Sequence, residues 1–379
     1  MIVGKQLFVK NFILIIYCLA ISGAAAYSLE KPVYNWDILP YMGVVLSYDK
    51  ADVNIIHSEV YAAAKEQIPH VFFGRLVDSS NAYRNNAAQN PPVFHAQFPF
   101  YVVKPLYTGM AWLFYKAGVS LSLSTVWPSV IAYFFTGLVL FCWLKKYWSV
   151  WYSCAAGILI MLSPPLLTVA GLSTPDALSG LLVFTAVYFL TEKKSAITVF
   201  VFLVMAIFAR LDNIIPAMCL LPFIFFTGKG GQKISAVMNL FLLSGLLLAY
   251  FIISAKTRAF GWSIFFYPAF IKQLNVSYTA GSSFDFAAYM ELVKSQLATG
   301  SFFSFISVFF FLVLVLLRNT SLFSFNKLTM EQMLAIVFVV IIVVRFVLQP
   351  LIADRIYVPY YLSVIAFSVK KNSVIVSQQ

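Results

Sequence analysis

Three aspartates of this sequence have neighbours that suit proton transfer or the binding of a charged ligand. Asp37 stands between Trp36 and an apolar run, and a carboxylate in such surroundings can have the raised pKa that a general base needs. Asp176 follows a Ser-Thr-Pro tripeptide, which is equally typical of a capped helix start. Asp212 follows Arg210 closely, and a plain salt bridge is the alternative there. We expect Asp37 to be the catalytic carboxylate.

Four basic residues form a second set of candidates, because each falls at the predicted outer end of an apolar segment. They are Lys104, Arg210, Arg345 and Arg355. Ionisable groups at membrane depth are costly and usually functional, although long basic side chains can also snorkel to the interface. A set of cations near one leaflet suits an anionic headgroup such as a phosphate or pyrophosphate.

The histidines show no metal-ligand spacing, and we predict neither a metal ion nor a cofactor. His57 lies on a predicted amphipathic helix over 52–67, with Tyr61 one turn later. It is either a plain surface residue or a contact for donor or acceptor. The sequence has no G-x-S-x-G, P-loop or H-E-x-x-H motif, which excludes the common serine hydrolases, P-loop ATPases and zincins.

The composition places these candidates in a membrane protein. A hydrophobic content of 61%, with only 11% charged residues, excludes an ordinary soluble domain. The mean hydropathy of +0.86 agrees. The net charge of +12 is spread over loops between apolar segments, so we interpret it as an orientation signal and expect no nucleic-acid partner. All four cysteines fall in apolar segments without C-x-x-C spacing, and we predict no disulfide or zinc site.

Clusters of basic residues predict how the chain crosses the membrane. The clusters are Lys145-Lys146, Lys193-Lys194, Lys229 with Lys233, Arg318 with Lys327, and Lys370-Lys371. Short loops rich in Lys and Arg stay cytoplasmic, so both termini are predicted to be cytoplasmic. The apolar segments then predict about ten transmembrane helices in a single all-α domain over 1–379. The expected spans are 8–27, 125–144, 150–169, 176–191, 195–210, 212–227, 234–254, 302–317, 331–348 and 356–369.

Two long outer loops, 28–124 and 255–300, complete the predicted topology. Segment 98–117 is apolar enough to span, but spanning would turn every basic cluster outward, so we predict that it lies flat in the outer interface. The polar segment 81–92 contains a Pro pair and is predicted to be a loop. The aromatic-rich loop 255–300 is long enough to act as a lid. The first span, 8–27, is predicted to stay attached and not to be cleaved as a signal peptide.

The order of these features resembles the GT-C superfamily of membrane glycosyltransferases. Asp37 stands where that superfamily carries an essential Asp in its first outer loop, and Lys104-Pro105 is similar to its juxtamembrane helix beside the carrier phosphate. Three further motifs are similar to its second-loop acidic position, its charged turn and its Arg-Tyr-x-x-Pro pattern near the last helix. They are Ser173-Thr174-Pro175-Asp176, Ala209-Arg210-Leu211-Asp212-Asn213 and Asp354-Arg355-Ile356-Tyr357-Val358-Pro359.

The resemblance implies a bacterial enzyme, similar to dolichyl-phosphate mannosyltransferases, that transfers a sugar from a polyprenyl-phosphate carrier to a glycan or lipid acceptor. The reaction is expected on the outer, periplasmic face of the inner membrane, with Asp37 as general base. The expected substrate-binding residues are Lys104, Asp176, Arg210, Asp212, Arg355, Tyr357 and His57. Two other classes stay open: a transporter or flippase for an anionic lipid or solute, and a non-catalytic membrane scaffold.

Overall fold

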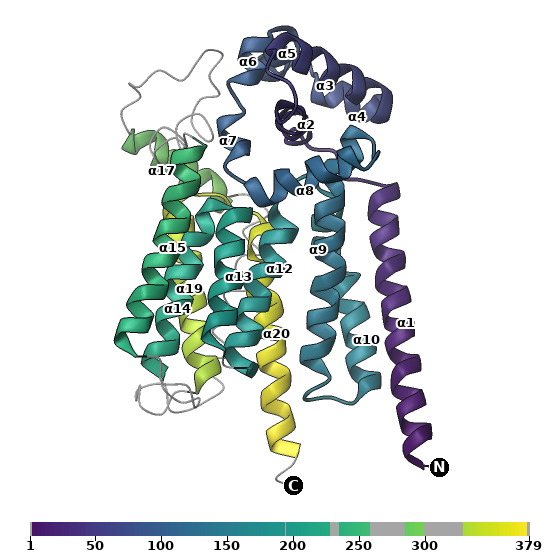
Figure 1. The fold of residues 1–379 in the computed structure, drawn as a ribbon, viewed down its shortest axis with the longest axis vertical. Coiled ribbons are helices and arrows are strands. Elements are labelled where there is room, and N and C mark those ends of the chain that lie inside the picture. Colours follow the sequence, from purple (N-terminus) through teal and green to yellow (C-terminus); the bar gives the residue numbers. More distant parts are fainter. Residues whose placement is uncertain (1, 194, 228–234, 258–284, 299–328, 377–379) are drawn as a thin grey trace.

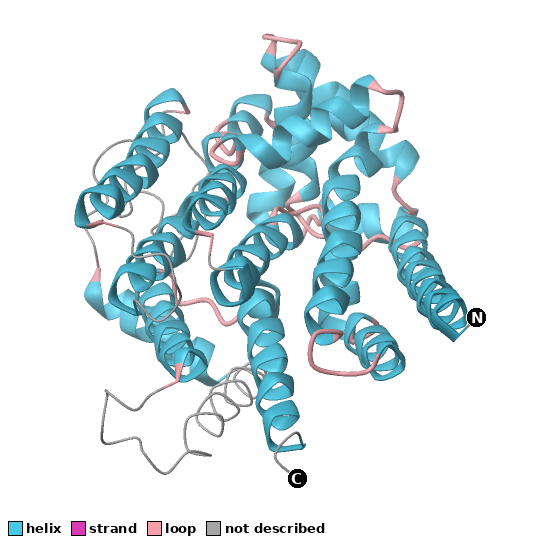
Figure 2. Cartoon of the chain, turned by 60° about the horizontal axis from the view of Figure 1, so that its bottom comes forward, coloured by secondary structure: helices cyan, strands magenta, loops and turns pink. Residues whose placement is uncertain are grey.

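The computed structural model describes residues 2–193, 195–227, 235–257, 285–298 and 329–376. Within these ranges the chain is helical, and the β structure is limited to an isolated parallel bridge between Val33 and Leu172. Figure 2 shows the helices side by side, with the loops confined to their ends. Short helices cover one end of the bundle, and both termini lie at the opposite end (Figure 1). The predicted all-α class is therefore confirmed.

Four helices of the described chain are long and apolar enough to cross a membrane. They are Val9–Glu30 within α1 (Ile2–Glu30), α9 (Leu121–Leu144), α15 (Ala236–Lys256) and α19 (Met330–Leu348). A fifth span results if α10 (Val150–Met161) and α11 (Pro164–Gly171) count as one helix bent by 63°. Proline at the start of α11 explains the break, since it cannot continue the hydrogen-bond ladder of α10. These helices indicate a membrane protein.

The predicted count of about ten spans is not supported by the helix lengths. The apolar helices α12 (Asp176–Tyr188), α13 (Ala196–Ala209) and α14 (Ile214–Thr227) have 13, 14 and 14 residues. A bilayer core takes about 20 residues. The predicted spans 176–191, 195–210 and 212–227 lie close to these helices, so the count was too high because such short apolar segments were accepted as spans. The predicted span 302–317 lies outside the described residues.

Helix α12 is the centre of the bundle and packs on α9, α13 and α20 (Asp354–Val376). Nearly all of its side chains are buried. Helix α1 is fastened to α9 and α10 by Tyr17, which is fully buried and donates a hydrogen bond to the Gly137 carbonyl oxygen at 2.7 Å. A Cβ placed on Gly157 would lie 2.8 Å from the Tyr17 ring. Two glycines thus make room for one tyrosine.

A layer of short helices, which we call the cap layer, covers the end of the bundle away from the termini (Figure 1). Its members are α2 (Ile38–Ser47), α3 (Val53–Gln67), α4 (His70–Leu76), α5 (Ala82–Gln89), α6 (Pro91–His95), α7 (Pro99–Val102) and α8 (Pro105–Lys116). It has a hydrophobic core of its own, in which Leu39, Val60 and Phe94 are fully buried. The predicted helix over 52–67 is α3, capped by the Asp52 carboxylate.

The prediction of a loop over 81–92 was wrong, because α5 and the start of α6 occupy this segment. Asn81 accepts a hydrogen bond from the Arg84 backbone N–H, and Pro91 stands in the first turn of α6, where proline is well tolerated. The segment 98–117 forms α7 and α8, and α8 runs across the upper ends of the long helices (Figure 1). With 12 residues, α8 is too short to span a bilayer.

The end of the bundle opposite the cap layer carries a group of charged side chains around Glu192. Lys146 Nζ lies 2.9 Å from a Glu192 carboxylate oxygen, and Lys370 Nζ lies 2.7 Å from Glu331 Oε1. Glu192 belongs to the π-helix Phe189–Lys193, which prolongs α12. Two of the predicted cytoplasmic clusters therefore meet at one end, where the termini also lie. The clusters at 229–233 and 318–327 fall outside the described residues.

Candidate functional site

An alternating chain of cations and carboxylates lies where the bundle meets the cap layer. Its order is Arg345, Asp212, Arg210, Asp176, Arg355 and Asp37. Together with Lys104, these residues are called the ionic cluster below. They come from α19, the turn after α13, the start of α12, the start of α20 and the residue before α2. Side chains that are far apart in sequence thus meet at helix ends.

The turn between α13 and α14 is built to present two of these charges. Arg210 ends α13, and Asp212 lies in the 3₁₀ turn Leu211–Asn213. The buried Asn213 amide donates to Ser179 Oγ at 2.8 Å and to the Ala206 carbonyl at 2.7 Å. These bonds fix the turn against α12. Arg210 and Asp212 are therefore held beside Asp176.

The inner part of the ionic cluster is well paired and largely covered. Arg210 binds Asp212 with two hydrogen bonds, Nε to Oδ1 at 3.0 Å and Nη2 to Oδ2 at 2.8 Å. Its Nη1 contacts Asp176, and Arg345 Nη2 contacts Asp212 Oδ2, the same oxygen that Arg210 Nη2 binds. The side chains of Asp176 and Arg345 are only 2% and 5% exposed. Buried charges require such partners, because an uncompensated one is strongly destabilising.

The other end of the chain of charges is open. Arg355 Nε lies 3.2 Å from Asp176 Oδ2, whereas its Nη1 lies 4.0 Å from Asp37 Oδ2. The side chains of Asp37 and Arg355 are each 30% exposed. Asp37 precedes α2, but its side chain makes no capping hydrogen bond. A ligand that reaches the ionic cluster therefore meets these two residues first.

Polar neighbours from the cap layer orient the Asp37 carboxylate. Asn35 Nδ2 donates to Oδ2 at 2.8 Å, and the Tyr101 hydroxyl donates to Oδ1 at 3.0 Å. The Tyr101 ring packs edge-on against Tyr41 with centroids 4.7 Å apart. Burial raises the pKa of both phenols well above the usual value, so each remains protonated and can donate. The carboxylate of Asp37 is thus held without being neutralised.

Lys104 adds a cation from the N-terminal end of α8. Its Nζ donates to the Tyr41 hydroxyl at 2.9 Å and lies 4.9 Å from the centre of the Tyr101 ring. Burial, together with the charge of Arg210, lowers the pKa of Lys104 to about 8. Four cations of the ionic cluster face three carboxylates, so the cluster carries one positive charge in excess. Such an excess favours an anionic ligand.

Two of the predicted substrate-binding residues, Tyr357 and His57, are not part of the ionic cluster. Tyr357 is buried in α20, and its hydroxyl donates to the Leu351 carbonyl at 3.3 Å. His57 Nε2 lies 3.0 Å from the Ala87 carbonyl oxygen, inside the cap layer. The His57 ring also packs on Tyr61, with centroids 4.5 Å apart. These contacts of His57 join α3 to α5 within the cap layer, outside the ionic cluster.

The predicted site did not include Tyr41, Tyr101 or Thr174, and it omitted Arg345. Thr174 Oγ1 donates to Asp176 Oδ2 at 2.8 Å and thereby completes that carboxylate's shell. Tyr41 lies one turn after Asp37 on α2, and this spacing places the two residues on one face. Arg345, a lone charge within an apolar helix, already stood out among the four outer cations.

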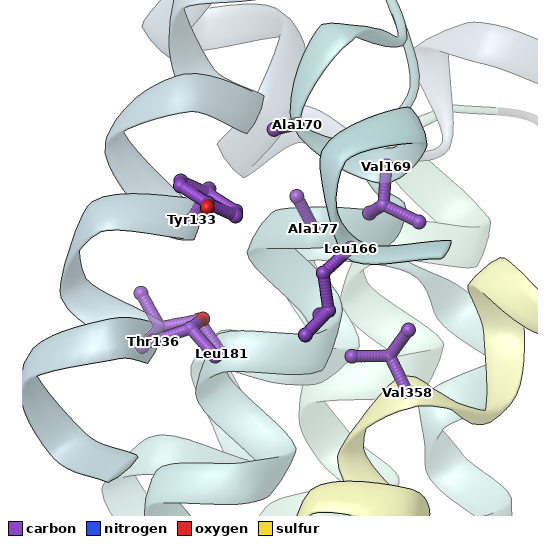
Figure 3. Close-up of a pocket in the computed structure, with 8 residues that line it drawn as sticks. All are labelled: Tyr133, Thr136, Leu166, Val169, Ala170, Ala177, Leu181 and Val358. Carbon is purple, nitrogen blue, oxygen red and sulfur yellow. The ribbon is translucent and has the colours of Figure 1, made fainter. Parts of the chain in front are cut away.

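An apolar pocket lies deeper in the bundle, between α9, α11, α12 and α20 (Figure 3). Its lining includes Tyr133, Thr136, Ala177 and Val358. The Tyr133 hydroxyl donates to the Met161 carbonyl at 2.9 Å, and Thr136 donates to the Ala132 carbonyl at 2.8 Å. Because both hydroxyls are already engaged, the pocket offers no group for acid–base chemistry.

No protein-family model matches this chain, and neither a curated protein nor a solved structure matches it. Within the described ranges, no three His, Cys, Asp or Glu side chains gather in a way that could hold a metal ion. The ionic cluster must be interpreted from its own geometry.

Proposed function

We propose that the ionic cluster is the active site of a membrane glycosyltransferase. The enzyme transfers a sugar from a polyprenyl-phosphate carrier to the hydroxyl of a glycan or lipid acceptor. One observation carries the proposal: a carboxylate, Asp37, and a guanidinium, Arg355, share the open end of an otherwise paired chain of charges. A base and an anion-binding group are what this transfer requires.

The cations suit the carrier phosphate. Arg355 keeps one edge of its guanidinium toward the open side while Nε remains on Asp176, and a planar fork of this kind matches phosphate oxygens. Lys104 supplies a second charge from α8, and the positive excess of the cluster adds to the attraction. Arg210 and Arg345 are paired with Asp212, and they stabilise the inner part of the ionic cluster.

The carboxylate suits the acceptor. Asp37 takes the proton of the acceptor hydroxyl while that oxygen forms a bond to the anomeric carbon. The bond between the anomeric carbon and the phosphate oxygen breaks, and its electron pair leaves with the phosphate. The departing phosphate gains negative charge, which Arg355 and Lys104 stabilise in a partly dry site. The hydrogen bonds from Asn35 and Tyr101 hold the Asp37 carboxylate in a fixed orientation.

The proposed topology places the cap layer on the periplasmic side of the inner membrane and both termini in the cytoplasm. The positions of Lys146 and Lys370 at the end opposite the cap layer support it. Helices α12, α13 and α14 run alongside the longer helices in Figure 1. Short helices can cross where a bilayer thins, so we retain them among the proposed spans.

A transporter or flippase for an anionic lipid is the second candidate function. The 63° break between α10 and α11 favours it, because transporters place broken helices at their substrate sites. Reconstituted vesicles separate the two functions: a flippase moves a labelled polyprenyl-phosphate lipid between leaflets without an acceptor, whereas a glycosyltransferase consumes a sugar-charged carrier.

The direct test is transfer from a panel of polyprenyl-phosphate sugars by the purified protein in nanodiscs. Asp37→Asn should lower the transfer rate by about 10²–10⁴-fold, because it removes a base without changing its size. Asp78→Asn is the matched control, since Asp78 lies between α4 and α5, outside the ionic cluster, and its carboxylate accepts hydrogen bonds from the backbone N–H and the hydroxyl of Ser80. Equal rates for wild type and Asp37→Asn would exclude Asp37 as the base.

A further inference from the structure

Arg355 is shared by two carboxylates that hold it unequally. The buried Asp176 binds its Nε at 3.2 Å, whereas the half-exposed Asp37 lies 4.0 Å from its Nη1. Asp176 cannot follow a moving partner easily, because Arg210 and Thr174 bind its two oxygens. Arg355 is therefore anchored through Nε, and only its Nη edge can change partners.

That Nη edge is also the part of the guanidinium that an incoming phosphate can reach. Arg210 and Arg345 are 16% and 5% exposed, and both contact Asp212. A phosphate has several acceptor oxygens in the geometry that a guanidinium fork prefers, whereas Asp37 offers one oxygen at a distance too long for a good hydrogen bond. The phosphate and Asp37 would therefore both accept hydrogen bonds from the Nη edge of Arg355.

We propose that Asp37 and the carrier phosphate compete for Arg355, so that donor binding releases Asp37 from the guanidinium and the acceptor must bind second. This inference rests on the proposed function. Before the donor arrives, Asp37 is paired and its Oδ2 faces a cation. Once the phosphate occupies Arg355, that oxygen keeps the hydrogen bond from Asn35, and its second lone pair can accept the proton of the acceptor hydroxyl.

Release does not mean that the base is lost. Asn35 Nδ2 and the Tyr101 hydroxyl hold one carboxylate oxygen each, and neither bond involves Arg355. The Asp37 carboxylate therefore stays in place when its cation turns to the phosphate. After transfer, Asp37 holds the proton of the acceptor hydroxyl; once that proton passes to water, the carboxylate can return to Arg355 and help to displace the spent carrier.

The test measures binding and not catalysis. Undecaprenyl phosphate and the uncharged alcohol undecaprenol are titrated into wild type, Asp37→Asn and Glu59→Gln in nanodiscs. Competition predicts that Asp37→Asn binds undecaprenyl phosphate about threefold to tenfold more tightly than wild type. Glu59→Gln removes a cap-layer carboxylate that pairs with Lys50, and it should leave the affinity unchanged.

A double-mutant cycle isolates Arg355 as the group for which the two anions compete. In an Arg355→Ala background, Asp37→Asn should no longer tighten binding. Equal or weaker binding by Asp37→Asn in the wild-type background overturns the competition but leaves the carrier site intact. If no variant prefers undecaprenyl phosphate to undecaprenol, the proposed function fails, and the competition fails with it.

Discussion

Asp37 and Asp176 lie on either side of Arg355, yet their surroundings give them different chemistry. Asp176 is 2% exposed and contacts two guanidinium groups, so its negative charge is fully paired and stabilises the packing of the helices. Asp37 is 30% exposed and lies further from its cation, and its hydrogen bonds within the described part of the chain come from the neutral donors Asn35 and Tyr101. A base needs this second environment, because its charge must stay available to a proton.

The lowered pKa of Lys104 predicts a pH dependence of carrier binding. As the pH rises through about 8, Lys104 loses its proton, so the affinity for undecaprenyl phosphate should fall between pH 7 and pH 9. The phosphate keeps its second negative charge over this range, since that proton leaves near pH 6. Binding titrations in nanodiscs measure the effect. Lys104→Met should bind more weakly at pH 7 and show a flat profile; an equally steep profile would contradict the assignment.

Stability should change with pH in the opposite sense to binding. The folded state releases the Lys104 proton near pH 8, whereas the unfolded chain keeps it to about 10.5. Between these values the unfolded state binds more protons, so the contribution of Lys104 to the free energy of unfolding rises with pH. The other charges that act on Lys104 come from Arg210, Asp37, Asp176 and Asp212.

At the scale of helices, the fit of Tyr17 between α9 and α10 should govern the stability of the bundle. Gly157→Ala would push a Cβ to 2.8 Å from a fully buried ring, and overpacking of this kind costs about 1–3 kcal/mol. Thermal unfolding in detergent should show a lower midpoint for Gly157→Ala. Gly23→Ala is the control, because a Cβ at Gly23 on α1 meets nothing within 4 Å.

A second variant tests whether the Tyr17 ring causes the loss. Tyr17→Leu in the Gly157→Ala background shortens the side chain that the new Cβ meets, so the double variant should lose less than the two single variants together. Simple additivity of the two losses would show that Gly157 matters for another reason.

Much of the helix pattern could be predicted from the sequence, because apolar runs and basic clusters record burial and orientation directly. The start of α12 at Asp176 and the turn at Arg210 were both anticipated. The helices α5 and α6 were not, since a polar segment with a Pro pair is typical of a loop until Asn81 is seen to cap it. The number of spans was overestimated, because the apolar segments 176–191, 195–210 and 212–227 were accepted as spans although the helices there have 13 or 14 residues.

The candidate site could be predicted residue by residue but not as a set of contacts. Lone charges near apolar segments marked Asp37, Lys104 and Arg355, because such charges are costly. Nothing in the sequence showed that Arg355 would be shared between Asp37 and Asp176, since pairing depends on how helix ends meet. Tyr41 and Tyr101 were missed because aromatic residues are abundant here and carry no such cost.

At the scale of the whole molecule, the two polar ends predict a sidedness that labelling can check. In a variant without its four native cysteines, Asp78→Cys in the cap layer should react with an impermeant thiol reagent added outside intact cells. Lys145→Cys, at the exposed far end of α9, should react only after the membrane is opened. Reaction of Lys145→Cys in intact cells would show that the orientation is opposite to the proposed one, with the ionic cluster on the cytoplasmic side.

The chain of charges also has a consequence for biogenesis. Arg345 and Arg355 are supplied by α19 and α20, which are synthesised after the helices that carry the rest of the ionic cluster. Until they arrive, Asp37, Asp176 and Asp212 face only Lys104 and Arg210, so the nascent site is one negative charge in excess. Insertion of α19 and α20 changes the net charge of the ionic cluster from negative to positive. A chain interrupted before α19 should therefore repel the anion that the proposed function requires, because the ionic cluster is complete only once α20 is inserted.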